Sequence, residues 1–385
     1  MSEKISLSIP NFCGNESKYV EETIRTGWVS TGGKFITDFE DAVAKYCGSK
    51  YAIAVQNGTA GLHLALIACG VKRDDLVIVP TLTFIASVNP IRYIGADPIF
   101  MDCDDSLCMD PIKLEKFLRE ECFLSSETLI YKNNGRKISA IVIVDIFGNP
   151  ADKEKIIQIA RKYKLKIVED SCEAMGSICE YGMYGGKHMG TLGDIGIYSF
   201  NGNKIITTGG GGMVVTDSEE IASVCRYLST QAKDDQLYYV HKNVGYNYRM
   251  TNTQAALGLA QLELLEKFIE IKRDNYFRYK LRIENETRYR MIDFRENTRP
   301  NYWFYSLLLD NEQQRDDLIN FFKENNIQTR PIWYLISELD PYKDCIAYKI
   351  EKAKFYWNRV LNLPCSTNLT QKEVDIVVDV LKRFK

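Results

Sequence analysis

Apolar and polar positions change in short blocks through the first two thirds of the chain. Apolar runs typical of strands buried on both faces occur at 51–55, 76–79, 98–102, 141–145, 166–170, 195–200 and 213–216. Helical spacing of apolar residues separates several of these runs, at 35–46, 59–69 and 84–93. Alternation of this kind predicts an α/β fold in which helices cover a mostly parallel sheet of about seven strands.

The pattern changes near residue 250. Thr251 followed by Gln254 matches a helix capping box, and 255–271 continues as a long amphipathic helix. A strand-like run at 303–309, a helix at 313–325, a short segment at 328–334 and a final helix from residue 371 follow. We therefore expect a large domain at 1–250 and a smaller C-terminal α+β domain at 251–385.

Composition and charge narrow the class of protein. Hydrophobic residues make up 45% of the chain, and the formal net charge is only -2 with both signs scattered. This balance gives no long-range attraction to nucleic acid or to anionic lipid. No apolar run approaches the roughly 20 residues that span a bilayer, and the N-terminus lacks the apolar core of a secretory signal. The sequence predicts a cytoplasmic protein with no membrane or nucleic-acid partner.

The cysteines and histidines predict no metal site. The eleven cysteines form no C-x-x-C pair and lie mostly in apolar stretches, as buried thiols do in a reducing compartment. Only three histidines are present, and none is clustered with cysteines. His188 lies in a glycine-rich loop at 185–190 that could border a substrate, but a solvated loop histidine is the favoured interpretation.

A small-residue turn at 56–60 joins a predicted strand to a predicted helix. Exposed N–H groups of a first helical turn bind anions, and the hydroxyl of Thr59 can add a further donor. The turn therefore suits a phosphate. Alone, the pattern favours a capped turn with no ligand.

Two further strand ends carry ionisable side chains. The apolar run at 166–170 ends in Glu169 and Asp170, and an acid there can keep the ring nitrogen of a pyridine cofactor protonated. The competing interpretation is an aspartate that caps a helix at 171–174. Lys204 follows the strand at 195–200 and precedes four glycines, where a desolvated amine can form an imine. The competing interpretation is a surface lysine beside a flexible loop.

Motifs for other phosphate sites and for serine hydrolysis do not occur. The chain contains no G-x-G-x-x-G, no G-x-x-x-x-G-K-[ST] and no G-x-S-x-G. These absences exclude the sequence signatures of Rossmann dinucleotide binding, P-loop nucleotide hydrolysis and α/β-hydrolase catalysis.

Seven ordered stretches together resemble the DegT/DnrJ/EryC1/StrS family of nucleotide-sugar aminotransferases over essentially the whole chain. They are Gly-Trp-Val-Ser-Thr-Gly at 27–32, Asn-Gly-Thr-Ala at 57–60, Thr-Leu-Thr-Phe-Ile-Ala-Ser at 81–87, Glu-Asp at 169–170, Gly-Asp-Ile-Gly at 193–196, Ser-Phe-Asn-Gly-Asn-Lys at 199–204 and Gly-Tyr-Asn-Tyr-Arg-Met at 245–250. The resemblance implies the aspartate-aminotransferase fold (fold type I), pyridoxal 5'-phosphate (PLP) as cofactor, and a homodimer with active sites shared between subunits.

The resemblance also implies roles for individual residues. Lys204 carries PLP as a Schiff base, and Asp170 pairs with its ring nitrogen. The remaining cofactor contacts expected from the same chain are Gly58, Thr59, Ala60, Phe84, Glu173 and Ser199, with Phe84 stacked on the ring. Asn247 and Arg249 are expected to reach the phosphate from the other subunit, and Ser30, Arg330 and Trp333 are candidate substrate contacts.

Two departures from the family pattern direct the substrate prediction. Glu173 stands where many relatives have Gln or His near the cofactor's phenolic oxygen, and the glycine run after Lys204 lacks the Glu that many relatives carry. Glu173 and the stretch 201–208 resemble the branch that makes 4-amino sugars for bacillosamine or legionaminic acid. That resemblance implies a UDP-linked 4-keto-6-deoxy-N-acetylhexosamine as amino acceptor and glutamate as donor.

Two alternatives to an aminotransferase stay open at this point. The family also contains PLP-dependent sugar dehydratases, in which histidine replaces the lysine, so Lys204 favours transamination. A regulatory protein that kept the fold and lost the chemistry is the other alternative, and the retained pair of Asp170 and Lys204 argues against it.

Overall fold

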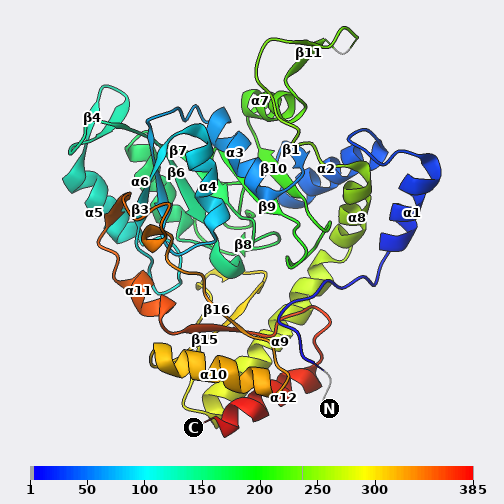
Figure 1. Ribbon diagram of the computed structural model, residues 1–385, viewed down its shortest axis with the longest axis vertical. Helices are drawn as coiled ribbons and strands as arrows, with labels where there is room; N and C mark the ends of the chain where they lie inside the picture. The colour runs from blue at the N-terminus through cyan, green and yellow to red at the C-terminus, as the bar shows by residue number, and fades with distance from the viewer. Residues whose placement is uncertain (1–3, 236, 385) are drawn as a thin grey trace.

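The computed structural model describes residues 4–235 and 237–384 and is built around one large sheet (Figure 1). Its strand order is β1-β10-β9-β7-β6-β2-β3-β17, with the β4–β5 hairpin paired to β6, which makes ten strands. The strands are β1 (Tyr51–Val55), β2 (Leu76–Pro80), β3 (Asp97–Met101), β4 (Cys122–Ser125), β5 (Thr128–Tyr131), β6 (Lys137–Val144), β7 (Lys166–Asp170), β9 (Ile195–Ser199), β10 (Gly212–Thr216) and β17 (Ile346–Tyr348).

The seven predicted strands are confirmed, and the mostly parallel order is too. The five neighbouring strands β9, β7, β6, β2 and β3 run parallel to one another. Strand β10 is antiparallel to both β1 and β9. The pattern did not predict three strands. β4 is largely exposed, and β17 is three residues long and finds its parallel partner β3 about 250 positions earlier, so neither carries a strong local signal.

Alternate residues of the strands point into two hydrophobic cores. On β2, Leu76 and Ile78 belong to the larger core, whereas Val77 and Val79 belong to the smaller one. Because both faces are covered, the strands read as continuous apolar runs. Each fully buried aliphatic side chain contributes roughly 1.5–3 kcal/mol of hydrophobic stabilisation.

Helices of the first 250 residues cover the two faces of the sheet. Side chains of α2, α5 and α6 enter the larger core, and those of α3, α4 and α7 enter the smaller one. These helices and the N-terminal helix are α1 (Glu16–Thr26), α2 (Lys34–Cys47), α3 (Gly58–Ala68), α4 (Asn89–Ile94), α5 (Pro111–Glu121), α6 (Lys153–Lys162) and α7 (Glu219–Ser229), with short 3-10 turns η1 (Ile85–Ser87) and η2 (Ile146–Gly148).

The C-terminal part forms a second, smaller sheet with the order β13-β15-β18-β16. Helices α9, α10 and α12 lie around it at the lower end of Figure 1, beside both chain termini. The elements are α8 (Asn252–Leu262), α9 (Leu265–Glu286), β13 (Arg290–Met291), β15 (Tyr305–Leu308), α10 (Glu312–Glu324), β16 (Arg330–Pro331), η3 (Ile336–Glu338), α11 (Lys352–Trp357), β18 (Val360–Leu363) and α12 (Gln371–Arg383).

Short strand pairs complete the fold outside the two main sheets. β8 pairs with β14, and β11 pairs with β12 in a hairpin that projects from the body of the molecule (Figure 1). These strands are β8 (Ile178–Cys179), β11 (Lys233–Asp235), β12 (Val240–His241) and β14 (Thr298–Arg299).

The predicted single helix at 255–271 is wrong. The capping box of Thr251 and Gln254 is present, but the helix is interrupted between α8 and α9. Glu263 at the interruption accepts hydrogen bonds from Asn15 (2.7 Å) and Tyr19 (2.7 Å) near the N-terminus. These tertiary contacts involve residues more than 240 positions away, so the periodicity of the segment did not indicate them.

Contacts at several places join the two parts of the chain. Ile5 pairs with Ile327, Cys365 N–H donates to the carbonyl of Leu7 (2.8 Å), and β17 extends the large sheet. The division at residue 250 stays a prediction. Between residues 4 and 384, apart from 236, no helix is long and apolar enough to cross a bilayer.

Candidate active site

A cavity of about 290 Å³ lies at the carboxyl ends of β1, β6, β7 and β9, where open sheets of this kind bind ligands. Its lining comes from segments far apart in the sequence. The lining residues are Asn57, Gly58, Thr59, Leu62, Phe84, Ala86, Ser87, Val144, Asp170, Cys172, Glu173, Ser199, Asn201, Asn203, Lys204, Trp303 and Trp333.

Asp170 ends β7 and is almost fully buried, with 4% of its surface exposed. Its Oδ2 accepts a hydrogen bond from Ser87 Oγ (2.6 Å), and its Oδ1 accepts one from the Cys172 N–H (3.2 Å). The helix that the competing interpretation placed at 171–174 is not formed, because the chain turns there. The carboxylate is therefore fixed at the edge of the cavity without capping a helix.

Lys204 follows β9 in a tight turn and is mostly buried. Its N–H donates to the Asn201 carbonyl (3.0 Å), and its Nζ lies 3.3 Å from Glu173 Oε1. The same Nζ lies 3.8 Å from the centroid of the Trp303 ring, whose indole N–H donates to the Asn203 carbonyl (2.7 Å). The surface-lysine interpretation is wrong, because the turn directs the amine into the cavity.

Glu173 is buried beside Lys204 and is held from the other side. Its Oε2 accepts a hydrogen bond from the Phe147 N–H (2.8 Å). Phe147 has a φ of 58°, a left-handed conformation that few non-glycine residues adopt, and such residues cluster at functional sites. Burial raises the pKa of the Glu173 carboxyl, and the nearby Lys204 ammonium offsets only part of that rise.

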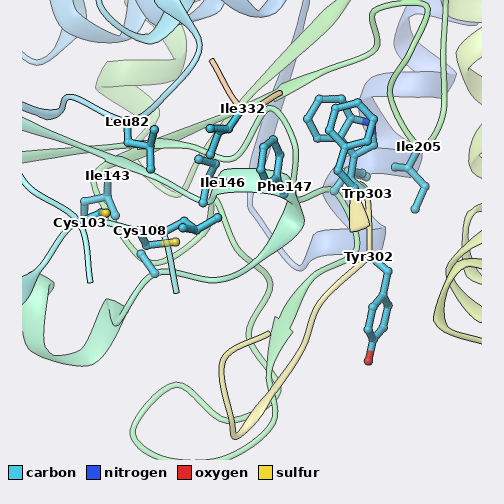
Figure 2. Packing of buried hydrophobic residues seen from close by; sticks show 14 of the residues in the cluster. Leu82, Cys103, Cys108, Ile143, Ile146, Phe147, Ile205, Tyr302, Trp303 and Ile332 are labelled. Atoms are coloured by element: carbon cyan, nitrogen blue, oxygen red, sulfur yellow. The ribbon is translucent and has the colours of Figure 1, made fainter. Parts of the chain in front are cut away.

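Aromatic rings close the cavity. Phe84 lies 5.8 Å from Trp333 and Trp333 lies 5.0 Å from Phe147, measured between ring centroids. Figure 2 shows Phe147 and Trp303 among the buried hydrophobic residues, and their ring centroids are 6.2 Å apart. Phe84, half exposed, is therefore available to stack on a planar ligand.

The N-terminus of α3 forms the opposite end of the cavity. Asn57 caps the helix by accepting the Ala60 N–H (2.8 Å), and Thr59 and Ser199 line the wall. A Cβ on Gly58 would lie 2.7 Å from Cys172 Sγ and 3.2 Å from Ser199 Cβ. Glycine is therefore required for the helix end to approach the end of β9 this closely.

The residues present fit PLP. A helix N-terminus with hydroxyls suits a phosphate, a buried carboxylate suits a ring nitrogen, and a lysine amine between them suits a carbonyl carbon. The cavity also has aromatic side chains at its wall, as a flat ring requires.

Five predicted site residues do not line this cavity. Ala60 is buried and its N–H is already donated to Asn57. The other four are Ser30, Asn247, Arg249 and Arg330. The carbonyl of Ser30 accepts the Asn252 N–H, Asn247 forms a β-bridge with Thr230, and Arg330 lies in β16.

Arg249 has a mostly buried side chain, which forms its contacts within its own subunit. Its guanidinium forms an ion pair with Glu40 and lies 3.4 Å from the Ala54 carbonyl. Arg226 pairs with the same carboxylate at 3.1 Å. In its own subunit Arg249 thus neutralises Glu40, and the expected contact of Asn247 and Arg249 with a partner subunit's site stays a prediction.

The sequence did not indicate several lining residues. Ser87 lies in the matched stretch 81–87, which could have drawn attention to it as a polar group next to Phe84. Cys172 follows Asp170 by two positions and was taken only as part of a helix. Trp303 lies about 100 positions after Lys204 and was assigned only to a strand, so no local signal pointed to the cavity.

The sheet order, the lysine after β9, the carboxylate at the end of β7 and the helix N-terminus after β1 define a PLP enzyme of the aspartate-aminotransferase fold type. The chain belongs to the DegT/DnrJ/EryC1/StrS aminotransferase family, whose sequence profile matches residues 12–382. Its relatives include PLP-dependent sugar aminotransferases, and this protein is one of them.

Individual relatives cover nearly the whole chain. GDP-perosamine synthase of Caulobacter vibrioides is 37% identical over 382 residues, which are 98% of this chain and 97% of that one. The UDP-4-amino-4,6-dideoxy-N-acetyl-beta-L-altrosamine transaminase of Campylobacter jejuni is 28% identical over 362 residues, 92% and 90% of the two chains. The solved structure of DesI with its TDP-sugar product has a TM-score of 0.86 at 25% identity, over 99% of this chain and 93% of that one.

Proposed function

We propose that this enzyme moves an amino group from glutamate to C4 of a GDP-linked 4-keto-6-deoxyhexose. The observation that carries the chemistry is the meeting of Lys204, Asp170 and the α3 N-terminus in one cavity. The GDP-perosamine synthase of Caulobacter vibrioides, 37% identical over 98% of this chain, supports the choice of nucleotide. The sequence prediction of a UDP-linked sugar is kept as the second candidate.

The second candidate rests on the residues that suggested it. Glu173 and the stretch 201–208 resemble the branch acting on UDP-linked 4-keto-6-deoxy-N-acetylhexosamines, and a UDP-sugar transaminase of Campylobacter jejuni is 28% identical to this chain. That identity is lower than the 37% of the GDP-perosamine synthase. We therefore place GDP first, and Arg330 and Ser30 stay candidate contacts to the sugar nucleotide in either case.

The residues of the cavity divide the reaction between them. PLP, when bound, supplies a carbonyl carbon that takes up the amine and an electron-withdrawing ring. Asp170 would pair with the ring nitrogen and keep it protonated. The Lys204 amine would take the proton from the α-carbon of glutamate and hold it on Nζ.

Glu173 is placed to set the charge of the Lys204 amine. Its Oε1 lies 3.3 Å from Nζ, so it can accept a proton from the ammonium and leave the neutral amine that proton abstraction requires. Burial raises the pKa of this carboxyl, which favours its uptake of the proton. Trp303 then keeps water from one side of the amine.

A homodimer with shared sites is part of the proposal. Exposed apolar side chains gather on the projecting hairpin at Leu237, Tyr238 and Tyr239, and on the loop after α1 at Trp28 and Val29. A second subunit that covered them would remove this apolar surface from water. In that arrangement Asn247 would contact the phosphate of the partner site, with Arg249 supporting its loop through Glu40.

The test is an amino-transfer assay with the enzyme loaded with PLP and supplied with glutamate. GDP-, UDP- and dTDP-linked 4-keto-6-deoxy sugars are compared by 2-oxoglutarate formation and by the mass of the amino-sugar product. We expect kcat/KM for the GDP sugar to exceed that for the UDP sugar at least about tenfold. The reverse order selects the second candidate, and a complete lack of transfer to C4 by enzyme that still reacts with glutamate contradicts both.

A further inference from the structure

Asp170 is backed by two hydroxyl groups that the proposed reaction does not use. Ser87 Oγ donates to Asp170 Oδ2 (2.6 Å), and Thr83 Oγ1 lies 2.8 Å from Ser87 Oγ. The exposed fractions are 1% for Thr83, 3% for Ser87 and 4% for Asp170. A buried polar chain of this kind is costly unless every member is satisfied, so its geometry is tightly constrained.

The direction of the two hydrogen bonds follows from the number of protons. An ionised carboxylate only accepts, so the single proton of Ser87 points to Asp170. Ser87 must then accept from Thr83, whose own proton closes the chain. The order is therefore Thr83 to Ser87 to Asp170, and it ends on the carboxylate at the cavity.

The backbone links this chain to the ring-stacking residue. Ser87 is the last residue of η1, and its N–H donates to the carbonyl of Phe84 (3.0 Å). One turn thus fixes the aromatic ring of Phe84 and the hydroxyl of Ser87 relative to each other. The described hydrogen bonds of Ser87 Oγ go to side chains, not to the backbone groups that a capping serine would bind.

We propose that Ser87 is a positioning residue that, with Thr83 behind it, holds the Asp170 carboxylate in the orientation that meets the ring nitrogen of PLP. This inference rests on the proposed contact of Asp170 with that nitrogen. Ser87 holds Oδ2 while the Cys172 N–H holds Oδ1, so both oxygens are restrained in one plane. A carboxylate released from Ser87 can rotate about its side-chain bonds, and its contact with the ring weakens.

The test measures binding of PLP and of its 1-deaza analogue, in which C–H replaces the ring nitrogen, to the apoprotein by quenching of tryptophan fluorescence. Trp303 and Trp333 line the cavity and report occupancy. In the native protein PLP should bind more tightly than the analogue. Ser87→Ala should reduce that preference about fivefold and should slow the reaction of the loaded enzyme with glutamate about 10- to 50-fold.

Two variants of Thr83 keep the test meaningful if Ser87→Ala folds poorly. Thr83→Val keeps the shape and removes the hydroxyl, and it should reduce the preference for PLP about twofold to threefold. Thr83→Ser keeps the hydroxyl and should behave like the native protein. Retention of the full preference for PLP over the analogue in both Ser87→Ala and Thr83→Val, whether or not the affinity for both ligands falls, would show that the hydroxyls do not orient Asp170, and would overturn the inference.

Asp170→Ala separates this inference from the proposed function. Loss of the preference in Asp170→Ala together with its retention in Ser87→Ala contradicts the inference alone. Retention of the full preference in Asp170→Ala contradicts the contact between Asp170 and the ring nitrogen, and the inference fails with it.

Discussion

Two lysines whose side chains are largely buried lie close to β7, and they differ in the number of carboxylates that surround them. Lys204 faces the cavity beside one carboxylate, Glu173, at 3.3 Å. Lys153, the first residue of α6, lies on the face of the sheet that carries the larger core. Its Nζ is 2.9 Å from Asp145 Oδ2 and 2.8 Å from Glu169 Oε2. Glu169 and Asp170 are consecutive on β7, so their side chains point to opposite faces of the sheet. Glu169 contacts Lys153 on one face, and Asp170 lines the cavity together with Lys204 on the other.

The two lysines also differ in the carboxylates that face them. Burial by itself would lower the pKa of Lys153, but the charges of Asp145 and Glu169 outweigh it and raise that pKa. Lys153 is thus a permanent cation. Glu173, the carboxylate 3.3 Å from the Lys204 amine, has a pKa that burial raises. The comparison indicates that the carboxylates around each lysine, and not burial alone, separate the structural Lys153 from the reactive Lys204.

Replacing Lys204 should give the largest effect on activity. Lys204→Met removes the amine that binds PLP and moves protons, so the rate of transfer should fall by roughly 10³-fold or more. The unfolding free energy of the apoprotein should change by less than about 1 kcal/mol, because the remaining Glu173 carboxyl, whose pKa burial already raises, can take up a proton and still accept the Phe147 N–H. Steady-state rates and urea unfolding check the two parts, and a large loss of stability would contradict the contrast.

Replacing Lys153 should give the converse result. Lys153→Met leaves two buried carboxylates facing each other, and the unfolding free energy should fall by about 3–5 kcal/mol. Urea unfolding of Lys153→Met beside Lys204→Met makes a matched pair. If Lys153→Met were as stable as the native protein, the ion cluster would not support β7 as we describe.

The smallest expected effect is on the pH dependence of stability, and it comes from His188 in a loop that Glu169 holds. Glu169 accepts the N–H groups of Gly190 (3.1 Å), Leu192 (2.6 Å) and Gly193 (2.5 Å), and His188 begins this loop. His188 was expected to be solvated, but it is partly buried, and its Nδ1 has no hydrogen-bond partner in the described part of the chain. Burial, followed by the charge of Arg299, lowers its pKa to about 4.

The lowered pKa of His188 makes the protein less stable at acidic pH. The unfolded chain binds a proton at His188 near pH 6.5, whereas the folded protein does so only near pH 4, so folding stability falls as the pH drops through this window. The loss due to His188 should be about 1–2 kcal/mol after allowance for its partial exposure. His188→Gln should remove that part of the slope in urea unfolding at pH 7, 5.5 and 4, and an unchanged slope would rule out His188 as its source.

The sequence alone predicts the seven central strands, their mostly parallel order and part of the site. Asp170 and Ser199 end β7 and β9, and Thr59 and Lys204 follow β1 and β9 within a few residues, so a strand assignment already places all four near one edge of the sheet. Glu173 and Phe84 came from ordered motif matches, not from periodicity. These parts were predictable because their positions depend on local spacing.

Only the tertiary structure decided the rest. Trp303 reaches Lys204 from about 100 positions away, and Ser87 reaches Asp170 from 83. Arg249 was bound to Glu40 across 209 positions, and the helix after Thr251 was interrupted by contacts with the N-terminus. Such pairings depend on which side chains the packed layers bring together, and a single chain's hydrophobic pattern specifies the layers without specifying those contacts.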